Sequence, residues 1–130
     1  MPAYEGSHFH PPAPLARVGL RHPEKGPTLP DVLMLIDSGA DVTLLPLASI
    51  DRLGVTVNSG EGYELMGFDG NRTVSHTVQV DLLFLRRVFE GRFLLIDQEW
   101  GILGRDVRNH LALLLHGPSS TWSEYLDMPR

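Results

Sequence analysis

The feature that most constrains the fold of this chain is the segment Asp31–Pro46, in which two apolar runs flank a short polar loop. The run Val32–Ile36 is continuous, which is typical of a strand covered on both faces. It leads directly into the loop Asp37–Ala40, and a second short buried strand is predicted over Val42–Leu45. A carboxylate at the end of buried strands is costly unless it is paired or takes part in chemistry. Asp37 is therefore a candidate catalytic residue, and the alternative is a β-turn in which Asp37 caps its own loop.

Most of the remaining sequence predicts short strands. Residues 16–21 alternate between apolar and polar positions, which indicates a strand with one buried face. Asp69-Gly70 is a hairpin turn signal between strands over 63–66 and 72–83. The other predicted elements are a strand over 89–96, a last core strand over 112–116, and short helices over 46–53 and 105–111. The sequence therefore predicts a mainly β fold with two short helices.

The composition excludes several classes of function. The chain has 130 residues, enough for one domain but not for two lobes with separate cores. Its formal net charge of -5 makes it a poor candidate for binding nucleic acid or an anionic membrane. It contains no cysteine, which excludes disulfides, thiolate metal sites and cysteine nucleophiles. No apolar run is long enough to cross a bilayer and no signal peptide is visible, so we expect a cytoplasmic protein.

Two segments resemble the signatures of the retropepsin-like aspartic proteases, the family of the retroviral enzymes. LIDSGADVTLLP is similar to the active-site loop of that family. GILGRDVRNHL is similar to its second signature, two apolar residues and a Gly followed by Arg and by Asp or Asn. The resemblance implies a single-lobe, retropepsin-like closed β-barrel with one or two short helices, acting as a two-fold dimer.

The resemblance covers residues 15–117 and thereby divides the chain. Seven of the ten prolines fall within residues 1–30. Because proline fixes φ and removes a backbone donor, we expect residues 1–14 to be a flexible N-terminal tail. Residues 118–130 are then a C-terminal extension. Both ends are longer than in retroviral relatives, whose termini build the dimer interface as interleaved strands.

Aspartic protease chemistry needs two carboxylates that share one proton and hold a water between them. Because two like charges so close cannot both ionise, one carboxyl acts as general base and the other as general acid. This chain has a single Asp-Ser-Gly segment, since Asn58-Ser59-Gly60 lacks the carboxylate. A complete site would need Asp37 from a second copy, and a two-fold axis brings a residue against its own image. The sequence predicts an aspartic endopeptidase that acts on peptide or protein substrates as a homodimer.

The resemblance implies roles for the other residues of the loop. Ser38 corresponds to a hydroxyl that braces the two loops across the dimer axis, Gly39 corresponds to a carbonyl that faces bound peptide, and Ala40 completes the motif. Asp41 and Arg105 correspond to an ion pair inside the lobe that ties the loop to the C-terminal helix. The alternative for these two residues is a pair of exposed charges that contribute little.

The predicted hairpin turn stands where the family has its flap, a lid over bound substrate. The residues of this turn are Met66, Gly67, Phe68, Asp69 and Gly70. The turn lacks the adjacent glycine pair of retroviral flaps. Phe68 is either an apolar lid over the substrate or an aromatic side chain that packs on its own hairpin.

No cofactor and no metal is predicted. His8 and His10 have metal-compatible spacing but lack a third ligand, so we interpret the spacing as incidental. Nucleotide-binding and serine-hydrolase motifs are absent from the sequence. One alternative function is a retropepsin-fold domain that binds a peptide, or mediates dimerisation, without catalysis. Another is a precursor whose N-terminal tail must be removed before the dimer forms.

Overall fold

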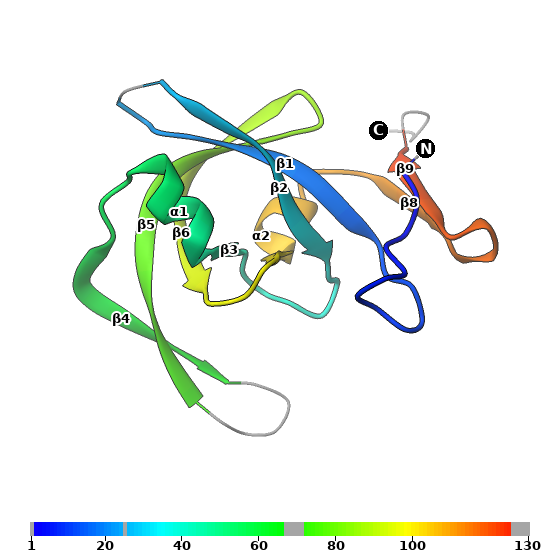
Figure 1. Cartoon of the computed structure of the whole chain (residues 1–130), viewed down its shortest axis with the longest axis horizontal. Helices are drawn as coiled ribbons and strands as arrows, with labels where there is room; N and C mark the ends of the chain where they lie inside the picture. Colours follow the sequence, from blue (N-terminus) through cyan, green and yellow to red (C-terminus); the bar gives the residue numbers. More distant parts are fainter. Residues whose placement is uncertain (1, 25, 67–71, 126–130) are drawn as a thin grey trace.

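Six strands form a closed β-barrel, to which a hairpin and a small terminal sheet are attached (Figure 1). The computed structural model describes residues 2–24, 26–66 and 72–125, and for 58–66 and 72–75 it describes the backbone alone. Neighbouring strands follow the order β1-β2-β7-β3-β6-β5, and β5 pairs back with β1 to close the ring. The ring strands are β1 (Leu15–Arg21), β2 (Thr28–Ile36), β3 (Leu44–Pro46), β5 (Arg72–Phe84), β6 (Arg87–Ile96) and β7 (Gly101–Leu103).

The remaining elements lie outside this ring. β4 (Asn58–Met66) pairs antiparallel with β5, and the two strands project from the barrel as a hairpin (Figure 1). β8 (Leu113–His116) and β9 (Thr121–Glu124) form a two-stranded sheet joined by the 3-10 turn η1 (Gly117–Ser119). The described helices, α1 (Leu47–Leu53) and α2 (Arg105–Arg108), are too short to cross a membrane. The predicted mainly β architecture, a closed barrel with two short helices, is confirmed.

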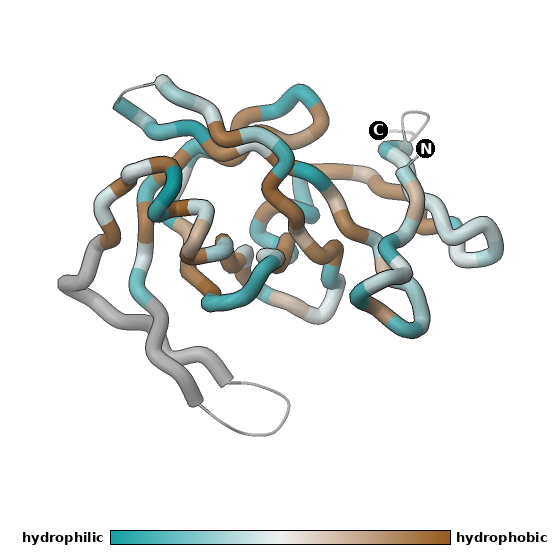
Figure 2. Tube along the Cα trace, viewed as in Figure 1, coloured by the Kyte–Doolittle hydropathy of each residue, from teal (hydrophilic) through white to brown (hydrophobic). Residues whose placement is uncertain are grey.

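The barrel is filled by side chains that alternate along its strands. In β1, Ala16, Val18 and Leu20 are buried while Arg17 between them is exposed, as the predicted period of two requires. Buried side chains from β2, β5 and β7 join them in one apolar cluster. Figure 2 shows apolar stretches, in brown, along the crossing strands of the barrel. Burying each large aliphatic side chain stabilises the fold by about 1.5–3 kcal/mol.

A cross-strand ion pair lies at the seam between β1 and β5. The seam contains only three residue pairs, and the last of them is Arg21 opposite Asp81. Arg21 Nη2 lies 2.9 Å from Asp81 Oδ2, and Nε donates to the same oxygen at 3.0 Å. Unlike charges at directly opposed positions favour one register over its neighbours, so this pair helps to specify how the ring closes.

The C-terminal part corrects the sequence prediction. A last core strand over 112–116 is wrong, because β8 pairs with β9 outside the barrel and exposes Leu114 and Leu115. β9 was not predicted, because its sequence has one apolar residue, Trp122. That residue is buried against the barrel, and its Nε1 donates to the carbonyl of Leu15 at 3.2 Å. α2 is also shorter than predicted and ends at Arg108.

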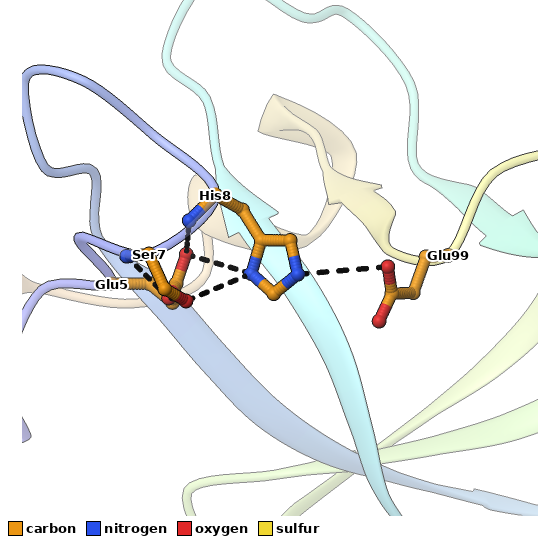
Figure 3. A network of polar contacts seen from close by, with 4 residues as sticks. All are labelled: Glu5, Ser7, His8 and Glu99. Atoms are coloured by element: carbon orange, nitrogen blue, oxygen red, sulfur yellow. Dashed lines mark hydrogen bonds and ion pairs between the residues drawn. The ribbon is translucent and has the colours of Figure 1, made fainter.

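Residues 2–14, which the sequence predicts as a flexible tail, make contacts with the body of the protein. His8 lies between two acids (Figure 3): its Nδ1 is 3.1 Å from Glu5 Oε2, and its Nε2 is 3.7 Å from Glu99 Oε2. The His8 ring also packs against Trp100, with ring centroids 5.5 Å apart. The flexibility of this segment and the boundaries after residues 14 and 117 stay predictions.

Candidate active site

Asp37 lies at the end of β2, in a loop that the backbone closes tightly. Its N–H donates to the Leu103 carbonyl at 3.5 Å, and its own carbonyl accepts from the Ala40 N–H at 3.3 Å. Its Oδ1 accepts from the Gly39 N–H at 2.9 Å, so Asp37 does cap its own loop. The two carboxylate oxygens offer about four acceptor positions, so this hydrogen bond leaves others free to bind water or substrate. Asp37 is only partly buried, so its carboxylate is accessible from solvent.

The outer turn of the same loop is exposed. Ser38 and Gly39 lie on the surface, at the point where the chain turns back toward β3. At Gly39 an added Cβ would lie 3.3 Å from Asp37 Oδ1, closer than most side chains come to a neighbour. The loop thus presents a hydroxyl and a backbone segment beside the carboxylate, on a face that a second molecule can approach.

Backbone contacts with the start of α2 hold this loop in place. The Arg105 N–H donates to the Ala40 carbonyl at 2.9 Å. A Cβ on Gly104 would lie 2.3 Å from the carbonyl carbon of Val42 and 2.9 Å from the Thr43 nitrogen. No side chain fits at such distances, so the glycine of the second signature is needed for a close approach of two backbones.

Thr43 and Asp106 form a second tie, which the sequence analysis did not identify. The Thr43 hydroxyl donates to Asp106 Oδ1 at 2.6 Å and accepts from the Gly104 N–H at 3.0 Å. The Thr43 N–H donates to Asp106 Oδ2 at 3.1 Å. Thr43 is 1% exposed, and a buried hydroxyl needs partners. A threonine inside the apolar run Val42–Leu45 was the available signal.

Asp41 and Arg105, the pair that the resemblance assigns to the interior, meet at the surface. Nη2 of Arg105 forms an ion pair with Oδ1 of Asp41. The two side chains are 48% and 78% exposed. An exposed pair is screened by water and contributes about 0.2–1 kcal/mol. The loop is therefore held to α2 chiefly by the hydrogen bonds between buried Thr43 and Asp106.

The hairpin of β4 and β5 supplies the arms of the predicted flap. Its strands pair from Asn58 opposite Thr77 to Met66 opposite Arg72, which agrees with the predicted hairpin. Gly67, Phe68, Asp69 and Gly70, like the side chain of Met66, lie outside the described residues. In the parts of the chain that the structure describes, no group of three or more His, Asp or Glu residues is arranged to hold a metal ion.

Comparison with known proteins shows which fold this architecture resembles. No protein-family model matches the sequence, and no curated protein matches it either. A solved structure described as EIAV protease complexed with the inhibitor HBY-793 matches with a TM-score of 0.57 and 26% sequence identity. The match covers 75% of this chain and 86% of that protease. The retropepsin-like resemblance drawn from the two signatures is thus confirmed at the level of the fold.

Proposed function

Because the chain has the retropepsin-like fold of a retroviral protease, we propose that it is an aspartic endopeptidase that hydrolyses peptide bonds as a homodimer. The observation that carries the proposal is the position of Asp37, a partly exposed carboxylate in a tightly closed loop at the end of a barrel strand. A binding domain gains nothing from a carboxylate held in this way. The chemistry instead needs a second carboxylate, and a second copy of the same loop supplies it.

In the proposed dimer, the two Asp37 carboxyls hold one water between them. The ionised carboxyl takes a proton from the water as the water oxygen attacks the peptide carbonyl carbon. The protonated carboxyl donates its proton to the carbonyl oxygen, which gives a tetrahedral diol. As the C–N bond breaks, the carboxyl that took the proton from the water gives it to the leaving amine, and the other carboxyl takes a proton from a diol hydroxyl. Ser38 would brace the two loops, and the backbone of Gly39 would orient the peptide. The β4–β5 hairpin would cover the bound substrate.

The first test is the Asp37→Asn variant in a peptide-library cleavage assay followed by mass spectrometry, from acid to neutral pH. We expect loss of cleavage with the melting temperature retained, because the amide keeps the shape of the carboxyl but cannot act as the base. Asp51→Asn, an exposed position on α1, is the matched control and should cleave like the parent. Unchanged cleavage by Asp37→Asn would exclude the mechanism. Peptide binding without cleavage by the parent would favour the non-catalytic binding module.

A further inference from the structure

The strand β6 has an unpaired edge along its first half. On one side β6 pairs with β5 from Arg87 to Leu94. On its other side β3 pairs with it over Leu94 to Ile96. Among the residues that the structure describes, no strand pairs with this second side of β6 before Leu94. The stretch Val88–Arg92 is therefore an open strand edge that leads up to β3.

The turn that joins β5 to β6 determines which backbone groups face this edge. Its two central residues, Leu85 and Arg86, have positive φ angles of 51° and 64°, as in a type I′ hairpin turn. Such a two-residue turn is closed by hydrogen bonds between the residues that flank it, here Phe84 and Arg87. Arg87 therefore directs its N–H and C=O groups toward β5.

The following residues of β6 face its two sides alternately. Val88, Glu90 and Arg92 accordingly direct their N–H and C=O groups away from β5, toward the open edge. Leu94 is the next residue of this series, and it is the residue at which the pairing with β3 begins. The edge therefore offers the backbone donors and acceptors of three residues to an incoming strand.

A hollow lies along this edge, between β6 and α2. It has a volume of about 710 Å³, and its lining residues are those of 87–93 together with Asp106, Val107 and His110. Because alternate residues of a strand point to opposite faces, a hollow lined by all of them lies beside the strand rather than over one face. At one end the Arg87 guanidinium donates to the His110 carbonyl, and at the other end β3 begins. The hollow thus gives a short extended segment access to the edge.

The side chains on the outer face of the edge carry opposite charges. Val88, Glu90 and Arg92 point to the same face, and all three are exposed. Unlike charges at directly opposed positions of an antiparallel pair favour pairing, and like charges oppose it. An incoming strand therefore needs an acid opposite Arg92 and a base opposite Glu90. Charges on an edge also prevent indiscriminate pairing, so these two side chains make the edge selective.

Gly91 adds a preference on the other face of the edge. A Cβ built on Gly91 would have no atom within 4 Å. Its neighbours on this face are Phe89 and Phe93, and Phe93 is buried. A residue opposite Gly91 directs its side chain to the same face. A large apolar side chain at that position would therefore fill the free space between the two aromatic rings.

We propose that the edge Val88–Arg92 is a docking site for an extended segment of another protein, which adds to β6 as an antiparallel strand. The segment carries an acid opposite Arg92, a large apolar residue opposite Gly91 and a base opposite Glu90. Three hydrogen-bonded pairs along the edge give about six new hydrogen bonds, two for each pair. This docking site goes beyond the proposed function and does not depend on it, because the Asp37 loop does not line the hollow.

Hydrogen exchange measured by NMR tests the docking site with a defined probe, the acetylated and amidated peptide TEFKVVT. Its acid, aromatic residue and base are placed for Arg92, Gly91 and Glu90. At saturation we expect the amides of Val88, Glu90 and Arg92 to exchange about tenfold more slowly or less, while those of Phe89 and Gly91, which face β5 already, change little. Unchanged exchange at the three edge amides would overturn the proposal.

The same amides also test whether a second copy of the chain occupies the edge. In that case the amides of Glu90 and Arg92 are protected in the protein alone, and their protection increases with protein concentration. This result would overturn the proposal of a separate partner.

Modified peptides test the register by fluorescence anisotropy. In TKFEVVT the acid and the base are exchanged, and we expect the dissociation constant to rise about tenfold or more. N-methylation of the lysine of TEFKVVT, whose N–H faces β6, should weaken binding as strongly. N-methylation of its phenylalanine, whose N–H faces away from β6, is the matched control and should leave the constant unchanged. Equal binding of TEFKVVT and TKFEVVT, or a preference for TKFEVVT, would overturn the proposal.

A charge exchange in the protein provides the reciprocal test. The double variant Glu90→Arg and Arg92→Glu changes exposed side chains only, and it should prefer TKFEVVT to TEFKVVT. The matched control exchanges another exposed pair, Asp51→Arg and Arg52→Glu on α1, and should keep the preference of the parent. A folded edge variant that still prefers TEFKVVT would overturn the proposal.

The Asp37→Asn variant separates this proposal from the proposed function, because it should bind TEFKVVT as tightly as the parent does. Loss of binding in that variant would assign the peptide to the candidate active site and overturn the docking site. Binding at the edge by a parent protein that never cleaves would leave the docking site standing and remove the protease function.

Discussion

The hydroxyl of Thr43 connects three parts of the candidate site, since it bonds both to the carboxylate of Asp106 in α2 and to the amide of Gly104. Thr43→Val keeps the shape of the side chain but removes both bonds and leaves the Gly104 N–H without its acceptor. We expect this change to lower the free energy of unfolding by about 1–3 kcal/mol, the cost of an unsatisfied buried group. Chemical denaturation of the variant measures it. A midpoint equal to that of the parent would show that the loop does not depend on this tie.

The Arg105→Ala variant should lose less stability than Thr43→Val. Its ion pair with Asp41 is exposed on both sides, so its removal should cost about 0.2–1 kcal/mol, less than Thr43→Val. The loss should shrink further in high salt, because exposed charges are screened. A loss larger than that of Thr43→Val, measured by the same denaturation, would contradict this order. The family signature singled out Arg105, whereas the only sequence signal for Thr43 was its place in an apolar run, and its partners Gly104 and Asp106 lie about sixty residues away.

At the scale of secondary-structure elements, the sequence predicts a strand well where one face is buried and the other is exposed. β1 alternates in sequence and in burial, and its limits were predicted within one residue. β8 has an equally apolar sequence but is mostly exposed outside the barrel, and apolar content alone does not distinguish such a strand from a core strand. β7 has three residues and β9 has one apolar residue, so neither carries a period that could be recognised. The loop at Asp37 was predicted because its motif is local.

The N-terminal segment should respond to acid through Glu5. Hydrogen bonds from Ser7 and from His8 lower the pKa of the Glu5 carboxyl from 4.5 to about 2. The pKa of Glu5 is lower in the folded protein than in the unfolded chain. The contribution of Glu5 to the stability of the folded state is therefore fully present above pH 4.5 and is lost as the pH falls toward 2. NMR titration of the Glu5 carboxyl should give a midpoint near 2, and Ser7→Ala should raise it. A midpoint near 4.5 in the parent would show that the local turn of Glu5, Ser7 and His8 does not form as described.

At the scale of the whole molecule, the single barrel supplies one Asp37 carboxylate, which is one half of the proposed two-carboxylate site. The retropepsin-like fold and the closed ring of strands make each copy a complete structural unit, with its own core. Under the proposed function the chemistry is complete only in a dimer, because the ring contributes one Asp37 loop. The proposal therefore predicts that dimer formation and activity depend on protein concentration in the same way.

Mixing parent and Asp37→Asn subunits tests this dependence directly. A mixed dimer holds one carboxyl and one amide, so it cannot supply both the acid and the base. The change removes a negative charge from the proposed dimer axis, so the variant should pair at least as well as the parent. With random exchange, about one quarter of the dimers in an equal mixture carry two Asp37 residues, as two-fold pairing requires.

Activity per total protein should fall to about that quarter and vary as the square of the parent fraction. The measurement needs subunit exchange faster than the assay and equal dimer dissociation constants for the two proteins, both of which sedimentation can establish. A site contained within one chain would give half the activity and a straight line through all mixing ratios. With exchange and pairing established, such a line would exclude the shared pair of Asp37 carboxyls, even though the fold is retropepsin-like.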